Sequence, residues 1–186
     1  LTGEDKKYLL KLGCKKDIHI IPPQIKKIEK SRSNKVENSI CFIGSFNREP
    51  NINAIEIFID SIFPKLDKKI TFNIAGKGLP NNIISKISIY DKINYLGFID
   101  DIDSFLASQM LMVAPINIGS GLKMKIPHSL SCGTPVITTS IGGEGINVNK
   151  DAGLVKSEIN YFAKEINELM NDYFTVCLVT HLLRAK

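Results

Sequence analysis

Residues 110–136 read MLMVAPINIGSGLKMKIPHSLSCGTPV, and this stretch decides the fold class. The apolar run Met110–Ala114 ends at a proline and has the length and composition of a buried strand. A glycine-containing loop follows it, and then a short helical segment that stops by Gly133 and a second apolar run, Pro135–Thr138. A strand, a loop, a helix and another strand form the repeating unit of a parallel α/β sheet.

The same alternation extends along the chain in both directions. Apolar runs predict further strands at 39–43, 70–75, 93–96 and 153–155, and periodic apolar positions predict helices at 51–63, 81–89, 101–107 and 158–170. Asn51 or Asn53 is the expected N-cap of the first of these helices, and Pro64 follows its end. We therefore predict an α/β fold with a Rossmann-like parallel sheet and helices on both faces.

The composition and the apolar pattern of the sequence change near residue 38 and again near residue 171. Residues 1–38 are rich in lysine and predict a small helix at Tyr8–Leu12 and a short strand at Ile18–Ile21. We expect residues 1–38 to be a crossover or linker from a preceding domain, and residues 39–170 to be the ligand-binding domain. Residues 171–186 are apolar in their centre and are expected to form a C-terminal tail helix.

Composition narrows the class of protein. Of 186 residues, 44% are hydrophobic and 23% are charged, which is ordinary for a globular protein, and no apolar run has the length of a membrane span. The four cysteines lie far apart and form no CxxC pair, so neither a metal site nor a disulfide framework is indicated. A reducing, cytoplasmic setting fits this pattern best.

The net charge of +5 comes largely from lysines that precede the first predicted strand. Such a basic flank suits contact with anionic lipid or with nucleic acid, but a solvated surface is the more economical interpretation. We expect no nucleic-acid partner, and we expect any membrane contact to be peripheral, at the inner face of the plasma membrane.

Three glycine-containing loops follow predicted strands: Gly44-Ser45, Gly76-Lys77-Gly78 and Gly119-Ser120-Gly121. One such loop is typical of any strand-to-helix turn, but three of them, two with neighbouring lysines, indicate an anion site. Lys123 and Lys125 lie two positions apart beside the third loop. Two amines in this position suit the two phosphates of a nucleoside diphosphate.

Residues 115–137 resemble the signature P-x-x-x-G-S-G-x-[RK]-x-K-I…L-x-x-G-x-P-V-[VI] of family 4, or group 1, GT-B glycosyltransferases. Four other segments resemble further family elements in the same order: the first glycine loop, the second glycine loop, the base-binding turn and the closing segment, at 42–54, 74–78, 95–101 and 138–145. The resemblance covers roughly residues 39–170. It implies the C-terminal, donor-binding half of a GT-B fold.

The resemblance also implies a function. The chain is expected to bind a UDP-, GDP- or other nucleotide-sugar and to serve a hexosyltransferase that acts on a polysaccharide or lipid-linked acceptor. It implies no metal and no cofactor, and it implies a separate N-terminal domain that binds the acceptor. This chain alone is then expected to be inactive.

The resemblance also assigns site residues, because positions of this sequence match positions in the family's motifs. The base is expected against Gly97, Phe98 and Ile99, and the ribose against His128. The pyrophosphate and its surroundings are expected at the residues of the three loops: Gly44, Ser45, Lys77, Gly119, Ser120, Gly121, Lys123 and Lys125. Lys123 and Lys125 would stabilise the charge of the leaving diphosphate, which is an electrostatic role. No catalytic side chain is identified.

The chain departs from the family pattern at three positions. The family has Glu where this chain has His128, and it often has another Glu where this chain has Ser120. Pro127 would cost about 3 kcal/mol inside a helix but nothing in a first turn, so the helix is predicted to begin between Lys125 and Pro127.

These departures leave a second hypothesis open, a non-catalytic nucleotide-binding or assembly module of the same fold. A Rossmann-like dehydrogenase is disfavoured, because no GxGxxG follows the first strand with an acidic residue about 20 positions on.

Overall fold

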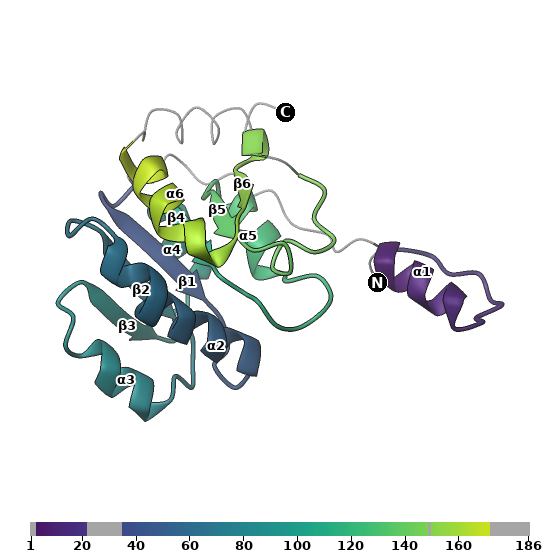
Figure 1. Cartoon of the computed structure of the whole chain (residues 1–186), viewed down its shortest axis with the longest axis horizontal. Coiled ribbons are helices and arrows are strands. Elements are labelled where there is room, and N and C mark those ends of the chain that lie inside the picture. Colours follow the sequence, from purple (N-terminus) through teal and green to yellow (C-terminus); the bar gives the residue numbers. More distant parts are fainter. Residues whose placement is uncertain (1–2, 22–34, 149, 172–186) are drawn as a thin grey trace.

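The computed structural model describes residues 3–21, 35–148 and 150–171, and Figure 1 shows a central sheet with helices packed around it. The sheet has six strands, all parallel, in the order β3-β2-β1-β4-β5-β6. The strands are β1 Ser39–Ile43, β2 Thr71–Ala75, β3 Ile93–Gly97, β4 Leu111–Ala114, β5 Val136–Thr138 and β6 Leu154–Lys156. The predicted Rossmann-like sheet is therefore confirmed.

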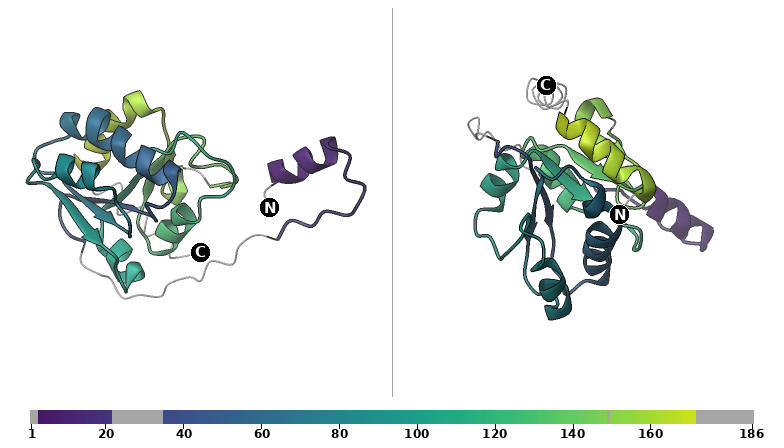
Figure 2. Two further views of the ribbon diagram at one scale, coloured as in Figure 1. Left: turned by 90° about the horizontal axis from the view of Figure 1, so that it is seen from below. Right: turned by 60° about the vertical axis from the view of Figure 1, so that its left-hand side comes forward.

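Helices cover both faces of this sheet, as the two views of Figure 2 show. The described α-helices are α1 Gly3–Lys11, α2 Glu49–Ile57, α3 Asn81–Ile87, α4 Ile102–Ser108, α5 Lys125–Ser131 and α6 Ile159–Asn171, and α1 takes no part in this cover. Helix α6 packs against the continuation of α2, and α4 packs against α5. Because both faces are covered, every residue of β1 and β4 is buried, which is the burial pattern of central parallel strands.

The strand order reverses direction between β1 and β4. From β1 the chain moves outward through β2 and β3, and it then crosses to β4 and moves outward on the other side. β1 pairs with β2 at five positions but with β4 at only two, Ile40 with Leu111 and Cys41 with Met112. The loops after β1 and β4 therefore leave the sheet in opposite directions, and a crevice opens between them.

Helix α2 begins earlier than its polar residues predict. It starts at Glu49 with Arg48 as the N-cap residue and with no side-chain capping bond, so the prediction of Asn51 or Asn53 as the N-cap was wrong. Pro50 explains the early start, because proline lacks the N–H that a first turn leaves unpaired. The Asn51 side chain is consequently free for another purpose, and its amide donates to the Ser45 carbonyl at 2.7 Å.

The second half of the predicted helix at 51–63 is not α-helical. Residues Phe58–Ile62 form a π-helical turn and Phe63–Lys65 form a 3₁₀ turn that contains Pro64. Phe58 in the π-helical turn is fully buried, and its ring centroid lies 4.2 Å from that of Phe72 on β2. Helix α3 likewise ends at Ile87, two residues before its predicted end.

Helix α5 runs from Lys125 to Ser131, within the bounds predicted from the sequence. Pro127 is its third residue and therefore lies in the first turn, where no intrahelical bond is lost. At this position proline does not end the helix, and it is compatible with the first turn. The side chains of Lys125 and His128 consequently project from the opening turns of a regular helix at the mouth of the crevice.

The ends of the chain match the predictions less closely. Helix α1 spans Gly3–Lys11 and lies away from the sheet in Figure 1. Ile18–Ile21 form no strand, so that prediction was wrong; an isolated apolar run with no partner strand has nothing to pair with. The tail predicted at 171–186 lies outside the described residues except for Asn171, and so does most of the predicted linker.

The described cysteines, Cys14, Cys41 and Cys132, form no disulfide bond with one another. Cys41 and Cys132 are buried, and burial raises the pKa of the Cys41 thiol, which keeps it protonated. The fourth, Cys177, lies outside the described residues. Among the described helices, none is both long enough and apolar enough to cross a bilayer.

Candidate functional site

A cavity of about 720 Å³ lies at the crevice between β1 and β4. Its walls come from the loop after β1, the start of α2, the loop after β4, the first turn of α4 and one side of α5. The lining residues are Ile43, Gly44, Ser45, Arg48, Pro50, Asn51, Asp103, Ile116, Ile118, Gly119, Ser120, Leu122, Lys123, Met124, Lys125, His128 and Ser131. This is where sheets of this topology bind their ligands, and the cavity has the size of a small-molecule site.

Lys125 lies at the centre of this site. Its Nζ donates to Asn51 Oδ1 at 2.5 Å and lies 4.0 Å from the centroid of the Phe42 ring. Burial lowers the pKa of Lys125 to about 7, because an ammonium loses hydration inside the protein. One hydrogen bond and a ring face compensate this loss only in part. An anion in the cavity would restore the missing charge partner.

Lys123 reaches the same cavity from the loop before α5. Its Nζ lies 3.2 Å from the Glu144 carboxylate and 3.4 Å from the Gly119 carbonyl oxygen. Glu144 belongs to the segment after β5. The ion pair thus joins two loops at the carboxyl end of the sheet and holds the Lys123 ammonium at the edge of the cavity.

Two glycines allow the backbone to pass close to these side chains. A Cβ at position 44 would lie 2.9 Å from the Asn51 side chain and 3.0 Å from Lys125 Nζ. Gly119 has φ of +97°, a conformation that other residues rarely adopt, and a Cβ there would lie 3.3 Å from Pro50. Any larger residue at position 44 would displace the contact between Asn51 and Lys125.

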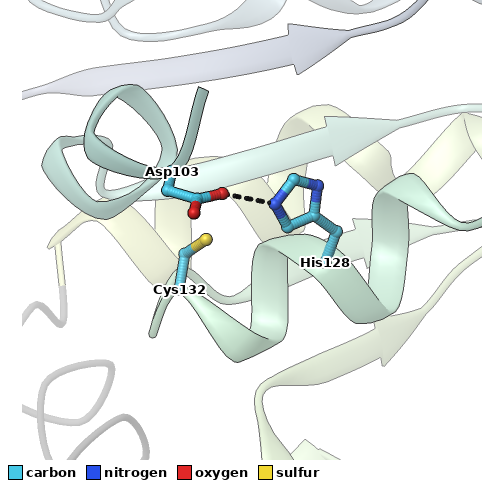
Figure 3. A group of neighbouring side chains, drawn as sticks. All are labelled: Asp103, His128 and Cys132. Carbon is cyan, nitrogen blue, oxygen red and sulfur yellow. Dashed lines mark hydrogen bonds and ion pairs between the residues drawn. The ribbon is translucent and has the colours of Figure 1, made fainter. Parts of the chain in front are cut away.

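The polar pair Asp103 and His128 lines the same cavity. His128 Nε2 lies 2.7 Å from Asp103 Oδ1, and the Cys132 thiol, four residues further along the chain, lies beside the Asp103 carboxylate (Figure 3). One ligand-type atom from each of the three residues lies within 4.8 Å of the other two. The hydrogen bond between the histidine and the aspartate already satisfies two of these atoms.

The turn after β3 lies beside the second glycine loop and outside the cavity lining. Gly76 N donates to the Gly97 carbonyl at 2.6 Å, and Lys77 Nζ lies 4.2 Å from the centroid of the Phe98 ring. Phe98 is 61% exposed, so this ring is open to a ligand that approaches from outside.

Seven of the predicted site residues meet in the cavity and five do not. Those that line it are Gly44, Ser45, Gly119, Ser120, Lys123, Lys125 and His128, and those that do not are Lys77, Gly97, Phe98, Ile99 and Gly121. Sequence reasoning missed Arg48, Asn51 and Asp103 as lining residues. Arg48 follows the first glycine loop closely and could have been inferred from this position, whereas Asp103 is 25 residues from its partner His128.

Comparison with known proteins agrees with this arrangement. A family model described as "Glycosyl transferases group 1" matches residues 37–172. An uncharacterised 44.6 kDa protein in the cps region of Klebsiella pneumoniae is 26% identical over 140 residues, which are 69% of this chain and 36% of that protein. The chain thus spans about a third of the length of this relative.

Solved structures share the fold. TarM of S. aureus, crystallised with fondaparinux, alpha-GlcNAc-glycerol and UDP, has a TM-score of 0.83 at 17% identity, over 100% of this chain and 39% of TarM. HepE of Anabaena in complex with UDP and glucose has a TM-score of 0.65 at 19% identity, over 80% of this chain and 43% of HepE. Because the family model matches most of the length of this chain, the chain belongs to the group 1 glycosyltransferases.

Proposed function

We propose that residues 39–170 bind the nucleotide-sugar donor of a hexosyltransferase, with the diphosphate in the cavity between the loops after β1 and β4. The observation that carries this proposal is the Lys125 ammonium, which is buried beside that cavity and has one amide oxygen as its hydrogen-bond partner. Lys123 and Arg48 add two further cations to the same walls. An anion with two charged groups is the ligand that suits this set best.

The chemistry of transfer follows from these charges. When a sugar leaves a nucleoside diphosphate, negative charge grows on the departing phosphate oxygens. Cations already fixed at those oxygens stabilise the transition state more than the ground state. In this proposal Lys123 and Lys125 act on the leaving group, and neither removes a proton. The site needs no metal in this proposal, because the lysines supply the positive charge.

The donor class is supported by the structural neighbours. TarM was crystallised with UDP, and HepE was crystallised in complex with UDP and glucose. We therefore propose a UDP-hexose as the first donor to test. The base would lie against Gly97, Phe98 and Ile99, beyond the cavity, where the exposed Phe98 ring offers a flat surface for stacking.

The acceptor and its domain are also proposals. The chain covers 36% of its Klebsiella relative, 39% of TarM and 43% of HepE. We propose that a second, N-terminal domain binds a polysaccharide or lipid-linked acceptor, and that this chain alone binds donor without turnover. The position of the relative in a cps region supports a role in polysaccharide assembly. The enzyme would then work in the cytoplasm, with peripheral contact to the membrane.

Calorimetric titration with UDP, GDP and their hexose conjugates tests the binding step. Binding is expected for one nucleotide series and should be lost in the double variant Lys123→Ala/Lys125→Ala. Lys86→Ala is the matched control, because Lys86 pairs with Asp60 and does not line the cavity. A folded chain that binds none of these compounds, or one that binds them equally well without the two lysines, would contradict the proposal.

The alternative function is a nucleotide-binding or assembly module without catalysis, and the His128 position favours it. A transferase requires that the donor's sugar as well as its nucleotide be recognised. If UDP and UDP-hexoses bind with equal affinity, and the chain joined to an acceptor-binding domain releases no UDP, the module is the better description.

A further inference from the structure

Asp103 and His128 form the acidic part of a cavity that is otherwise cationic. Arg48, Lys123 and Lys125 line the same cavity. With a neutral imidazole, the pair carries a single negative charge, which belongs to Asp103. Such a charge would repel phosphate oxygens, so the pair suits an uncharged, hydroxyl-bearing part of the ligand.

The hydrogen bond to Asp103 determines which nitrogen of the His128 ring is a donor and which is an acceptor. His128 Nε2 lies 2.7 Å from Asp103 Oδ1, and a carboxylate oxygen only accepts, so Nε2 carries the hydrogen. In a neutral imidazole the other nitrogen, Nδ1, is then an acceptor. Figure 3 shows Nδ1 on the opposite side of the ring from Asp103. His128 lines the cavity, and a ligand hydroxyl is the kind of group from which a neutral Nδ1 would accept a hydrogen bond there.

The pair is held by rigid elements on both sides. His128 projects from α5, and Asp103 lies in the first turn of α4. Asp101 caps that turn: Ser104 N donates to Asp101 Oδ1 at 3.0 Å, and Ser104 Oγ donates to Oδ2 at 2.6 Å. Capping of this kind fixes the first turn of a helix and therefore the position of the Asp103 carboxylate.

We propose that Asp103 is a positioning residue for donor recognition, which holds His128 so that Nδ1 accepts a hydrogen bond from a ribose hydroxyl. This inference rests on the proposed function. Helix α4 begins five residues after Gly97, at the turn proposed to bind the base, and α5 begins at the diphosphate lysine Lys125. A group that joins these two helices lies between the base and the diphosphate, which is the place of the ribose in a nucleotide.

The test compares UDP with 2′-deoxy-UDP and 3′-deoxy-UDP in calorimetric titrations of the whole 186-residue chain. UDP has no hexose, so any discrimination reports on the ribose alone. The unmodified chain is expected to bind UDP about tenfold more tightly than the analogue that lacks the recognised hydroxyl. In Asp103→Ala and in His128→Ala this preference should fall to about twofold or less, with the dependence on Lys125 retained.

Three further variants separate positioning from simple structural support. The double variant Asp103→Ala/His128→Ala should be no worse than His128→Ala alone, because Asp103 acts only through His128. Asp103→Ala/His128→Glu should restore the preference, since a carboxylate is an acceptor that needs no partner to orient it. Asp60→Ala is the matched control, and thermal midpoints verify that each variant is folded.

Each possible result supports or contradicts the positioning role of Asp103. If UDP binds through the lysines but the preference survives Asp103→Ala, the positioning role is wrong and the proposed function stands. If Asp103→Ala and His128→Ala act additively, Asp103 has an independent role and the inference also fails. A preference that disappears on treatment with a chelator would assign Asp103, His128 and Cys132 to a metal ion. Absence of any nucleotide binding would overturn both this inference and the proposed function.

Discussion

Two lysines at opposite ends of the sheet show how differently one side chain can be used. At the amino ends of the strands, Lys35 Nζ donates to the Gln109 carbonyl at 2.7 Å, to Thr134 Oγ1 at 2.9 Å and to the Gly133 carbonyl at 3.2 Å. These three acceptors match the three donors of an ammonium. At the carboxyl ends, Lys125 donates to Asn51 and faces a cavity.

We propose that this difference separates a structural cation, Lys35, from a binding cation, Lys125. Lys35 connects the segments that precede β1, β4 and β5, so its charge is used to hold the fold together. Lys125 is buried at a cost that the protein itself does not fully offset, as its lowered pKa indicates. In the proposed function, the ligand supplies the negative charge that Lys125 lacks in the free protein. Matched substitutions at the two ends can test this contrast.

Lys125→Met is expected to have the largest effect on binding. Methionine keeps most of the aliphatic volume and removes the ammonium, so affinity for UDP should fall roughly 10- to 100-fold, the range for a lost charge-assisted hydrogen bond. Stability should not fall, because a buried charge is removed. Titration calorimetry and chemical denaturation measure the two quantities. Reduced stability with unchanged affinity would assign Lys125 to the same structural class as Lys35.

Lys35→Met is expected to reduce stability and to leave the affinity for UDP nearly unchanged. Three acceptors lose the hydrogen bond that Lys35 donates, so the free energy of unfolding should decrease by about 1–3 kcal/mol. Affinity for UDP should remain within about twofold of the unmodified chain, because Lys35 lies at the far end of the strands. Denaturation curves and titrations on the same samples give both values. A large loss of affinity in a folded Lys35→Met protein would contradict the division between the two ends.

The pH dependence of binding should follow Lys125. Its pKa is about 7 in the empty cavity, and a bound diphosphate favours the ammonium form. Binding above pH 7 therefore takes up a proton, and affinity should fall as pH rises, by up to about tenfold per pH unit. The terminal phosphate of UDP, with a pKa of about 6, is already ionised in this range. Titrations in buffers of different ionisation enthalpy measure the proton uptake, which should vanish in Lys125→Met.

The contribution of Lys125 to the stability of the free protein should rise with pH, whereas the affinity for UDP should fall. The pKa of Lys125 is lower in the folded chain than in the unfolded chain, where it is about 10.4. Between pH 7 and about pH 10 the unfolded state binds more protons at this site, so its contribution to stability rises with pH. Denaturation at several pH values, with Lys125→Met as the reference, isolates this contribution. An equal pH dependence in both proteins would exclude Lys125 as its source.

Gly44→Ala should give the smallest effect. The added methyl would lie 2.9 Å from the Asn51 side chain and 3.0 Å from Lys125 Nζ, so those two side chains must move by a few tenths of an ångström. We expect a loss of a few-fold in UDP affinity and little change in stability, since Gly44 needs no positive φ. Asn47→Ala, at an exposed residue of the same loop that does not line the cavity, is the control for a general disturbance of the loop. Unchanged affinity in Gly44→Ala would show that the cavity tolerates a wider loop.

Local chemistry made much of this molecule predictable. The strands that end just before Gly44 and Pro115 follow from their apolar composition, and Pro127 located the start of α5 because proline fits a first turn. The failures have a common cause, which is that a side chain's partner is set by the tertiary fold. Asn51 suits an N-cap on propensity alone, yet it lies near Lys125 and bonds there. Asp103 and His128 meet only because α4 and α5 pack together.

The short pairing of β1 with β4 has a consequence for hydrogen exchange. Beyond Cys41 and Met112 the two strands continue without further paired positions, so backbone bonding holds the two halves of the sheet together at one end only. A donor in the cavity would contact Gly44 on one half and Lys125 on the other. Amide protection along this junction should therefore increase when nucleotide binds, and the increase should be larger there than at the fully paired junction of β1 with β2.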